Sequence, residues 1–147
     1  MEYPVEVFIY DLSQGMARPL GPTLGLPNLE GVWHTSIVVH GTEIFFGSSG
    51  IEQCIPGSSR FGQPREKKNL GNTSIDMNTL TSYLQQVGQT EFHGTKYDLL
   101  KHNCNSFSST LTKFLGVQDV PRHILALPNY VLSTPLGAIL GNLAKNM

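Results

Sequence analysis

Cys104 stands where a thiol could act as a nucleophile. It opens a run in which apolar residues recur at helical spacing, and Asn103 before it is a candidate N-cap. In the first turn of a helix the positive end of the macrodipole favours a thiolate, and unpaired backbone N–H groups can stabilise an oxyanion on an attacked carbonyl. Free cysteine is also among the most buried residue types, so the alternative is that Cys104 is a small buried hydrophobe.

Five histidines could supply the base that a cysteine nucleophile needs. His34 lies within residues 32–39, where β-branched and aromatic residues predict a strand, and a strand holds an imidazole more reproducibly than a loop does. The alternative is a core histidine held by one hydrogen bond. His102, two residues before Cys104, is expected to point away from the thiol. His40 lies beside the turn and is expected to face solvent, and His93 and His123 lie in loop-like surroundings without a partner pattern.

The second cysteine shows no sign of chemistry. Cys54 lies between Gln53 and Ile55 without a capping pattern, and we interpret it as structural. The spacing of cysteines and histidines resembles no zinc site, and neither glycine-rich phosphate-binding motif occurs. We therefore expect no metal and no cofactor.

The elements that would position these residues are strands in the first half of the chain. Residues 5–10 are apolar on both faces and predict a mostly buried strand. Residues 32–39 and 43–46 flank a short turn and predict an antiparallel hairpin, and a further strand fits best at 51–55. Alternation along the first hairpin strand separates two sets of side chains: Trp33, Thr35, Ile37 and Val39 on one face, His34, Ser36 and Val38 on the other.

Helices are predicted in the second half. Asp76 can cap a helix that Gly88 ends, and the helix from Cys104 ends at Gly116. Short helical segments with proline at an N1-like position begin at Pro121 and Pro135. The last segment carries an apolar stripe that needs tertiary or partner packing: Leu136, Ile139, Leu140 and Leu143.

Two stretches are predicted to be loops because glycine and proline are dense in them. These are residues 13–31 and residues 47–74, the latter including a charged run at 65–68 that we interpret as a solvated surface loop. Strands come first and helices later, which predicts an α+β fold with a mainly antiparallel sheet.

Composition narrows the class of protein. The chain has 147 residues, is 39% hydrophobic and 14% charged, and has a formal charge of −1, which favours one folded domain and argues against a nucleic-acid partner. The longest apolar runs are far shorter than the roughly 20 residues of a membrane span, and the N-terminus lacks a signal-peptide pattern. Two cysteines are too few for a disulfide scaffold. We expect a soluble intracellular domain in the cytoplasm, with the nucleus reachable by diffusion.

Three blocks of sequence resemble the PPPDE family of permuted papain-fold peptidases, and within it the deSUMOylating isopeptidases. The blocks are residues 31–38 (GVWHTSIV), 45–51 (FFGSSGI) and 102–107 (HNCNSF), and the segments Tyr10–Ser13 and Leu132–Pro135 also fit. The resemblance preserves order and runs across nearly all of the chain. It implies a single domain over residues 1–147 with a circularly permuted papain-like fold, in which the histidine precedes the cysteine.

The resemblance also implies a Cys–His dyad, with Cys104 as nucleophile and His34 as base. Asn103 would cap the helix beside the oxyanion site, and Trp33 would either wall the substrate cleft or belong to the core. No third catalytic residue is assigned. The implied reaction is cleavage of the isopeptide bond between a ubiquitin-like modifier and a lysine of its target. SUMO is the modifier that the resemblance favours.

Two other functions stay open. The same dyad could hydrolyse acyl thioesters, as in protein depalmitoylation, or the scaffold could bind a modifier or client without cleaving it. The apolar stripe near the C-terminus could also join two copies in a homodimer.

Overall fold

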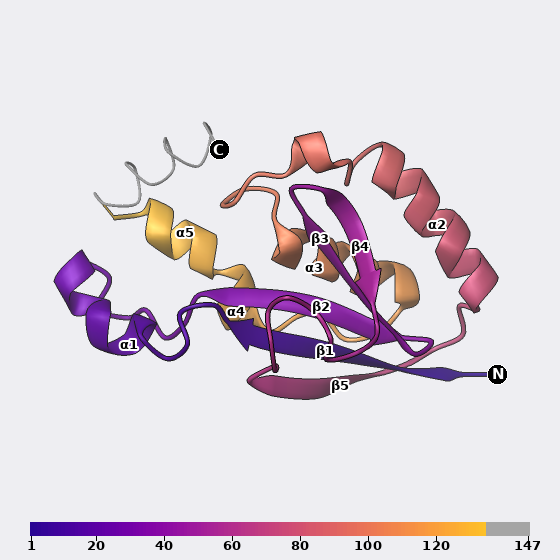
Figure 1. Cartoon of the computed structure of the whole chain (residues 1–147), viewed down its shortest axis with the longest axis horizontal. Helices are drawn as coiled ribbons and strands as arrows, with labels where there is room; N and C mark the ends of the chain where they lie inside the picture. Colours follow the sequence, from indigo (N-terminus) through magenta and orange to yellow (C-terminus); the bar gives the residue numbers. More distant parts are fainter. Residues whose placement is uncertain (135–147) are drawn as a thin grey trace.

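Five antiparallel strands form one sheet in the order β4-β3-β2-β1-β5 in the computed structural model, which describes residues 1–134 (Figure 1). The strands are β1 (Tyr3–Asp11), β2 (Trp33–Val39), β3 (Thr42–Gly47), β4 (Gly50–Cys54) and β5 (Glu66–Thr73). The predicted hairpin is β2–β3, and the predicted further strand is β4. The sheet is packed with helices, so the predicted α+β class is confirmed.

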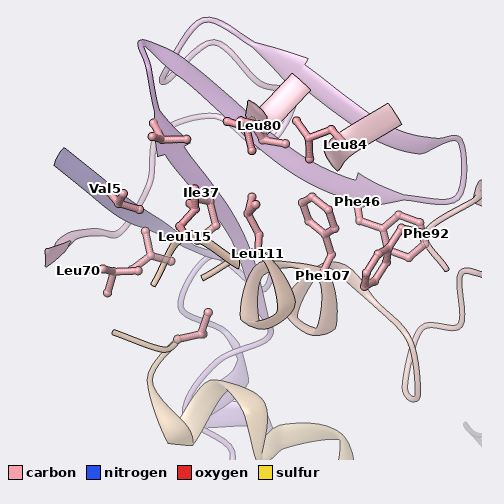
Figure 2. Close-up of a cluster of buried hydrophobic side chains, with 14 of the residues drawn as sticks. Val5, Ile37, Phe46, Leu70, Leu80, Leu84, Phe92, Phe107, Leu111 and Leu115 are labelled. Carbon is pink, nitrogen blue, oxygen red and sulfur yellow. The ribbon is translucent and has the colours of Figure 1, made fainter. Parts of the chain in front are cut away.

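The longer helices are α2 (Met77–Gln89) and α3 (Cys104–Leu115). Both contribute to the main core against the sheet, and Figure 2 shows Phe107 and Leu111 of α3 lying beside the strands. The short helical segments are α1 (Ala17–Leu20), η1 (Pro22–Leu24), η2 (Gly94–Lys96), α4 (Arg122–Leu125) and α5 (Leu127–Leu132). Within residues 1–134, no helix combines the length and the apolar content needed to cross a bilayer.

Both faces of the sheet carry buried side chains near β1 and β2. Ile37 and Val39 belong to the main core with the helices, whereas Val38 packs with Phe8 and Tyr10 on the opposite face. The alternation predicted for β2 is therefore confirmed, because strand side chains point alternately to the two faces.

The sheet opens between β2 and β3. These strands pair only where Ile37–Val39 meet Thr42–Ile44, while residues 33–36 of β2 pair with β1 and residues 45–47 of β3 pair with β4. In Figure 1 the β3–β4 hairpin rises away from β2. The first turn of α3 lies beside this opening, where Asn105 bonds to β2.

The interpretation of residues 65–68 as a solvated loop is wrong, because Glu66–Thr73 is the edge strand β5, paired with β1. Charged residues suit an exposed edge, since they discourage pairing with another chain. Lys67 also lies with its amino group 4.9 Å from the centre of the Phe8 ring. The charge hid the strand because its register is set by β1 and not by an apolar pattern of its own.

Two helix boundaries also differ from prediction. Asp76 caps α2 by accepting the Thr79 N–H at 2.8 Å, as expected, but the helix passes through Gly88 to Gln89. Gly116 does end α3, with a left-handed φ of 73°. Pro121 is the N-cap of α4 and not its first residue. The segment predicted to begin at Pro135, with its apolar stripe, lies outside the described residues.

Candidate active site

His34 and Cys104 line one cavity of about 550 Å³, which reaches them at the opening between β2 and β3. His34 comes from the first half of β2 and Cys104 is the first residue of α3. None of the other four histidines lines this cavity, and Cys54 on β4 does not line it either. Chain segments 70 positions apart thus present a thiol and an imidazole to the same space.

Asn103 fixes the start of α3 through a capping box. Its Oδ1 accepts the backbone N–H groups of Asn105 (2.9 Å) and Ser106 (3.2 Å), while Ser106 Oγ accepts the Asn103 N–H at 3.1 Å. The Asn103 Nδ2 donates to the Leu99 carbonyl at 2.8 Å. The side chain of Asn103 is therefore committed to the helix and its preceding loop, and the Cys104 N–H is left as a first-turn amide that the cap does not use.

Asn105 ties α3 to β2 on both sides of His34. Its Nδ2 donates to the Trp33 carbonyl at 3.1 Å, and its Oδ1 accepts the Thr35 hydroxyl at 2.8 Å. The same Oδ1 lies 3.7 Å from the Cys104 sulfur, within reach of the thiol proton. The sequence shows only an amide next to the cysteine, and its partners become visible once the strand is placed.

The His34 imidazole lies in an aromatic pocket and is 3% exposed. Phe61 stacks on it with ring centroids 3.8 Å apart, Phe45 meets it edge-on at 5.4 Å, and Tyr10 lies at 5.5 Å. Burial, with a smaller contribution from the Arg60 charge, lowers the pKa of His34 to about 3. The imidazole is therefore neutral at physiological pH.

The Cys104 thiol is also buried and neutral. Its residue is 7% exposed, and burial raises the thiol pKa to about 11, although hydrogen bonds from the backbones of Thr35 and Asn105 act in the opposite direction. Within residues 1–134, no hydrogen bond joins Cys104 to His34. The cavity thus holds a neutral thiol and a neutral imidazole, and not an ion pair.

Trp33 lines the cavity but is only half-buried. Its ring meets the His123 ring edge-on at 5.5 Å, and the Arg65 guanidinium lies 5.8 Å from its centre. His102 points away from the thiol, as expected: its Nε2 lies 2.8 Å from the Glu91 carbonyl and its ring stacks on Phe92.

The cavity walls are largely apolar and come partly from segments for which the sequence predicted no role in the site. The region predicted as a plain loop at 13–31 contains α1 and η1, and its leucines meet the residues of α5. The recurring leucines within that glycine- and proline-rich stretch are the signal that could have revealed the wall. The apolar wall residues from these two segments are Leu24, Leu26, Leu29, Leu127, Pro128 and Val131.

A helix-initiating cysteine and a strand histidine line one cavity, and a thiol with a base in reach of the same space is what a cysteine-type hydrolase requires. The family model described as "PPPDE putative peptidase domain" matches residues 3–144. The chain therefore belongs to the PPPDE peptidase family, and it is a cysteine peptidase of the isopeptidase type.

Proteins similar to this chain carry concordant names. It is 47% identical over 138 residues to desumoylating isopeptidase 1 of Rattus norvegicus, an alignment that covers 94% of this chain and 82% of the relative. The Homo sapiens protein of the same name is 46% identical over the same shares. The DeSI-like protein sdu1 of Schizosaccharomyces pombe is 29% identical over 89% of this chain and 67% of the relative.

Proposed function

We propose that the protein removes SUMO from lysine side chains through a dyad of Cys104 and His34. The observation that supports this dyad is that both side chains line the same cavity, one from the N-terminus of α3 and one from β2. The names of the similar proteins in rat and human support SUMO as the modifier.

In the proposed reaction His34 takes the Cys104 proton as the sulfur attacks the carbonyl carbon of the modifier's C-terminal glycine. The bond from sulfur to carbon forms, and the carbonyl oxygen becomes an oxyanion. The Cys104 N–H is the donor for that oxyanion, because Asn103 already occupies the next two amides. Asn103 thus acts on the oxyanion by capping the helix, and its own amide does not contact the oxygen.

The second half of the reaction uses the proton held by His34. The imidazolium gives it to the departing lysine amine as the carbon–nitrogen bond breaks, which leaves a thioester between Cys104 and the modifier. His34 then takes a proton from water as the water oxygen attacks the thioester carbon. The carbon–sulfur bond breaks, the imidazolium returns its proton to the sulfur, and the modifier leaves as a carboxylic acid that loses its proton to solvent. A tail of two glycines suits this site because residues without Cβ allow close backbone approach, and we assign Trp33 to the wall beside that tail.

The test is hydrolysis of a purified SUMO conjugate linked through a lysine isopeptide bond. Cys104→Ala and His34→Ala are expected to abolish turnover, since each removes one half of the dyad. Cys54→Ala is the matched control and keeps wild-type turnover, because Cys54 does not line the cavity. Wild-type rates in Cys104→Ala would refute the proposal.

A long-chain acyl thioester is the second candidate substrate. The apolar lining of the cavity favours it, because a tail of two glycines brings no side chain to cover leucine, valine and phenylalanine side chains. The comparison to make is kcat/KM for a palmitoylated cysteine peptide against kcat/KM for the SUMO conjugate. A higher value for the peptide would assign the site to thioesters, and binding of SUMO without turnover of either substrate would assign it to a binding module.

Location and assembly are further proposals. We place the protein in the cytoplasm and nucleus because its mass of 16.2 kDa permits passive diffusion through nuclear pores. Cell fractionation tests this, and light scattering on the purified chain tests whether it forms a homodimer.

A further inference from the structure

Ser36 is the one hydrogen-bond partner of the His34 ring within residues 1–134. Its Oγ lies 3.3 Å from His34 Nε2, and the hydroxyl makes no other hydrogen bond in that part of the chain. Ser36 is fully buried. By strand alternation it shares with His34 the face of β2 on which Val38 packs against Phe8 and Tyr10, opposite the main core. The two polar groups depend on each other, because an unpaired buried hydroxyl or ring nitrogen is costly.

Among residues 1–134, no other group forms a hydrogen bond with Nε2. Phe45 and Phe61 offer only ring carbons, and the Tyr10 hydroxyl donates to the buried Glu43 carboxyl at 2.6 Å. Stacking on Phe61 further restricts the tilt of the imidazole. The Ser36 hydroxyl is therefore the group that can hold Nε2 in a hydrogen bond, as the acceptor from an Nε2–H or as the donor to a bare Nε2.

A neutral imidazole has one nitrogen with a proton and one with a lone pair. His34 Nδ1 has no hydrogen bond within residues 1–134, so it is the nitrogen left for the thiol of Cys104. It can take a proton only if the ring's own proton is on Nε2. A hydroxyl oxygen that accepts from Nε2 holds that proton there.

We propose that Ser36 is the positioning residue of the dyad, which holds His34 as the Nε2–H tautomer and keeps the Nδ1 lone pair free for the Cys104 proton. This inference rests on the proposed function. The same oxygen also accepts from Nε2 while the ring is an imidazolium, so one contact serves both protonation states.

The matched pair of variants is Ser36→Ala and Ser108→Ala. Ser108 is also fully buried, and its hydroxyl donates to the Thr35 carbonyl at the same 3.3 Å, but it does not contact His34. Ser36→Ala is expected to lower kcat on the SUMO conjugate about 10- to 100-fold with KM within about twofold, since loss of a general base costs roughly 10²–10⁴ and a wrong tautomer disables part of the population. Ser108→Ala is expected to keep the wild-type kcat. Ser36→Thr, which keeps the hydroxyl, is expected to have most of the wild-type kcat.

A second measurement does not depend on activity. Long-range ¹H–¹⁵N correlation spectra of the folded wild-type protein are expected to show His34 protonated at Nε2, and Ser36→Ala to show a mixture. Protonation at Nδ1 in the wild type would overturn the proposal even if Ser36→Ala fails to fold. Equal kcat for Ser36→Ala and Ser108→Ala, with Cys104→Ala inactive, would overturn the role of Ser36 and leave the dyad in place. An active Cys104→Ala would instead overturn the dyad itself.

Discussion

Replacing Asn105 by alanine tests whether one carboxamide holds the helix that begins at Cys104 against the strand that carries His34. The substitution removes the bonds to the Trp33 carbonyl and to the Thr35 hydroxyl. It also leaves the Thr35 hydroxyl buried without its partner, since Thr35 is fully buried. Alanine keeps the helix, because it is the best helix former.

The expected cost is about 3 kcal/mol of unfolding free energy. Each neutral hydrogen bond contributes about 1 kcal/mol net, and leaving a buried partner unpaired adds about 1 kcal/mol or more. For a chain of this length each kcal/mol moves Tm by about 2–4 °C, so Tm should fall by about 6–12 °C.

A double-mutant cycle with Thr35→Val isolates the bond between the two side chains. Thr35→Val alone removes the hydroxyl, and in the Asn105→Ala background it removes a group that is already unpaired. Unfolding by urea should therefore give a coupling energy of about 1–2 kcal/mol between the two positions. Costs that add within about 0.3 kcal/mol would show that the bond does not contribute, and would refute its role in joining α3 to β2.

Three other properties follow from the buried polar groups. The pKa of His34 falls from 6.5 to about 3 on folding, so between these pH values only the unfolded chain gains a proton. The free energy of unfolding, compared with that of His34→Gln, should therefore drop by about 1.4 kcal/mol for each pH unit below 6.5. A difference between the two proteins that does not change with pH would contradict this. With a pKa of about 11, Cys104 in Cys54→Ala should react with iodoacetamide ever faster up to about pH 10, and rapid, pH-independent alkylation at pH 5 would instead mean an ion pair. Glu43→Gln should lower the free energy of unfolding by about 2 kcal/mol in thermal unfolding. The two carboxyl oxygens accept hydrogen bonds from the Tyr10 hydroxyl and the Gly57 N–H, and the single oxygen of glutamine replaces only one of them. An unchanged Tm would show that the lost bond contributes nothing to stability.

The helix of Cys104 and the strand of His34 were predictable because each has a local cause. Asn103 caps the helix, Gly116 ends it, and alternation along β2 sets the face of each side chain. Local pattern also located β3 and β4, whose residues prefer strands whatever their neighbours.

The remaining parts of the site depend on contacts between distant segments. β5 forms because β1 offers it an edge, and its charged residues hide that pairing in the sequence. The apolar walls arise where the α1–η1 region meets α5, about 100 positions later. The hydrogen bonds of Asn105 to Trp33 and Thr35, the two neighbours of His34, likewise form only when α3 lies against β2.

The most direct measurement of the central claim is the site at which a reactive SUMO attaches. SUMO that ends in an electrophilic propargylamide is incubated with the full chain, and the adduct is mapped by mass spectrometry. We predict one adduct, on Cys104, with Cys54 unmodified and with the reaction lost in His34→Ala. An adduct on Cys54, or no adduct on a folded protein, would contradict a SUMO-directed site built on Cys104.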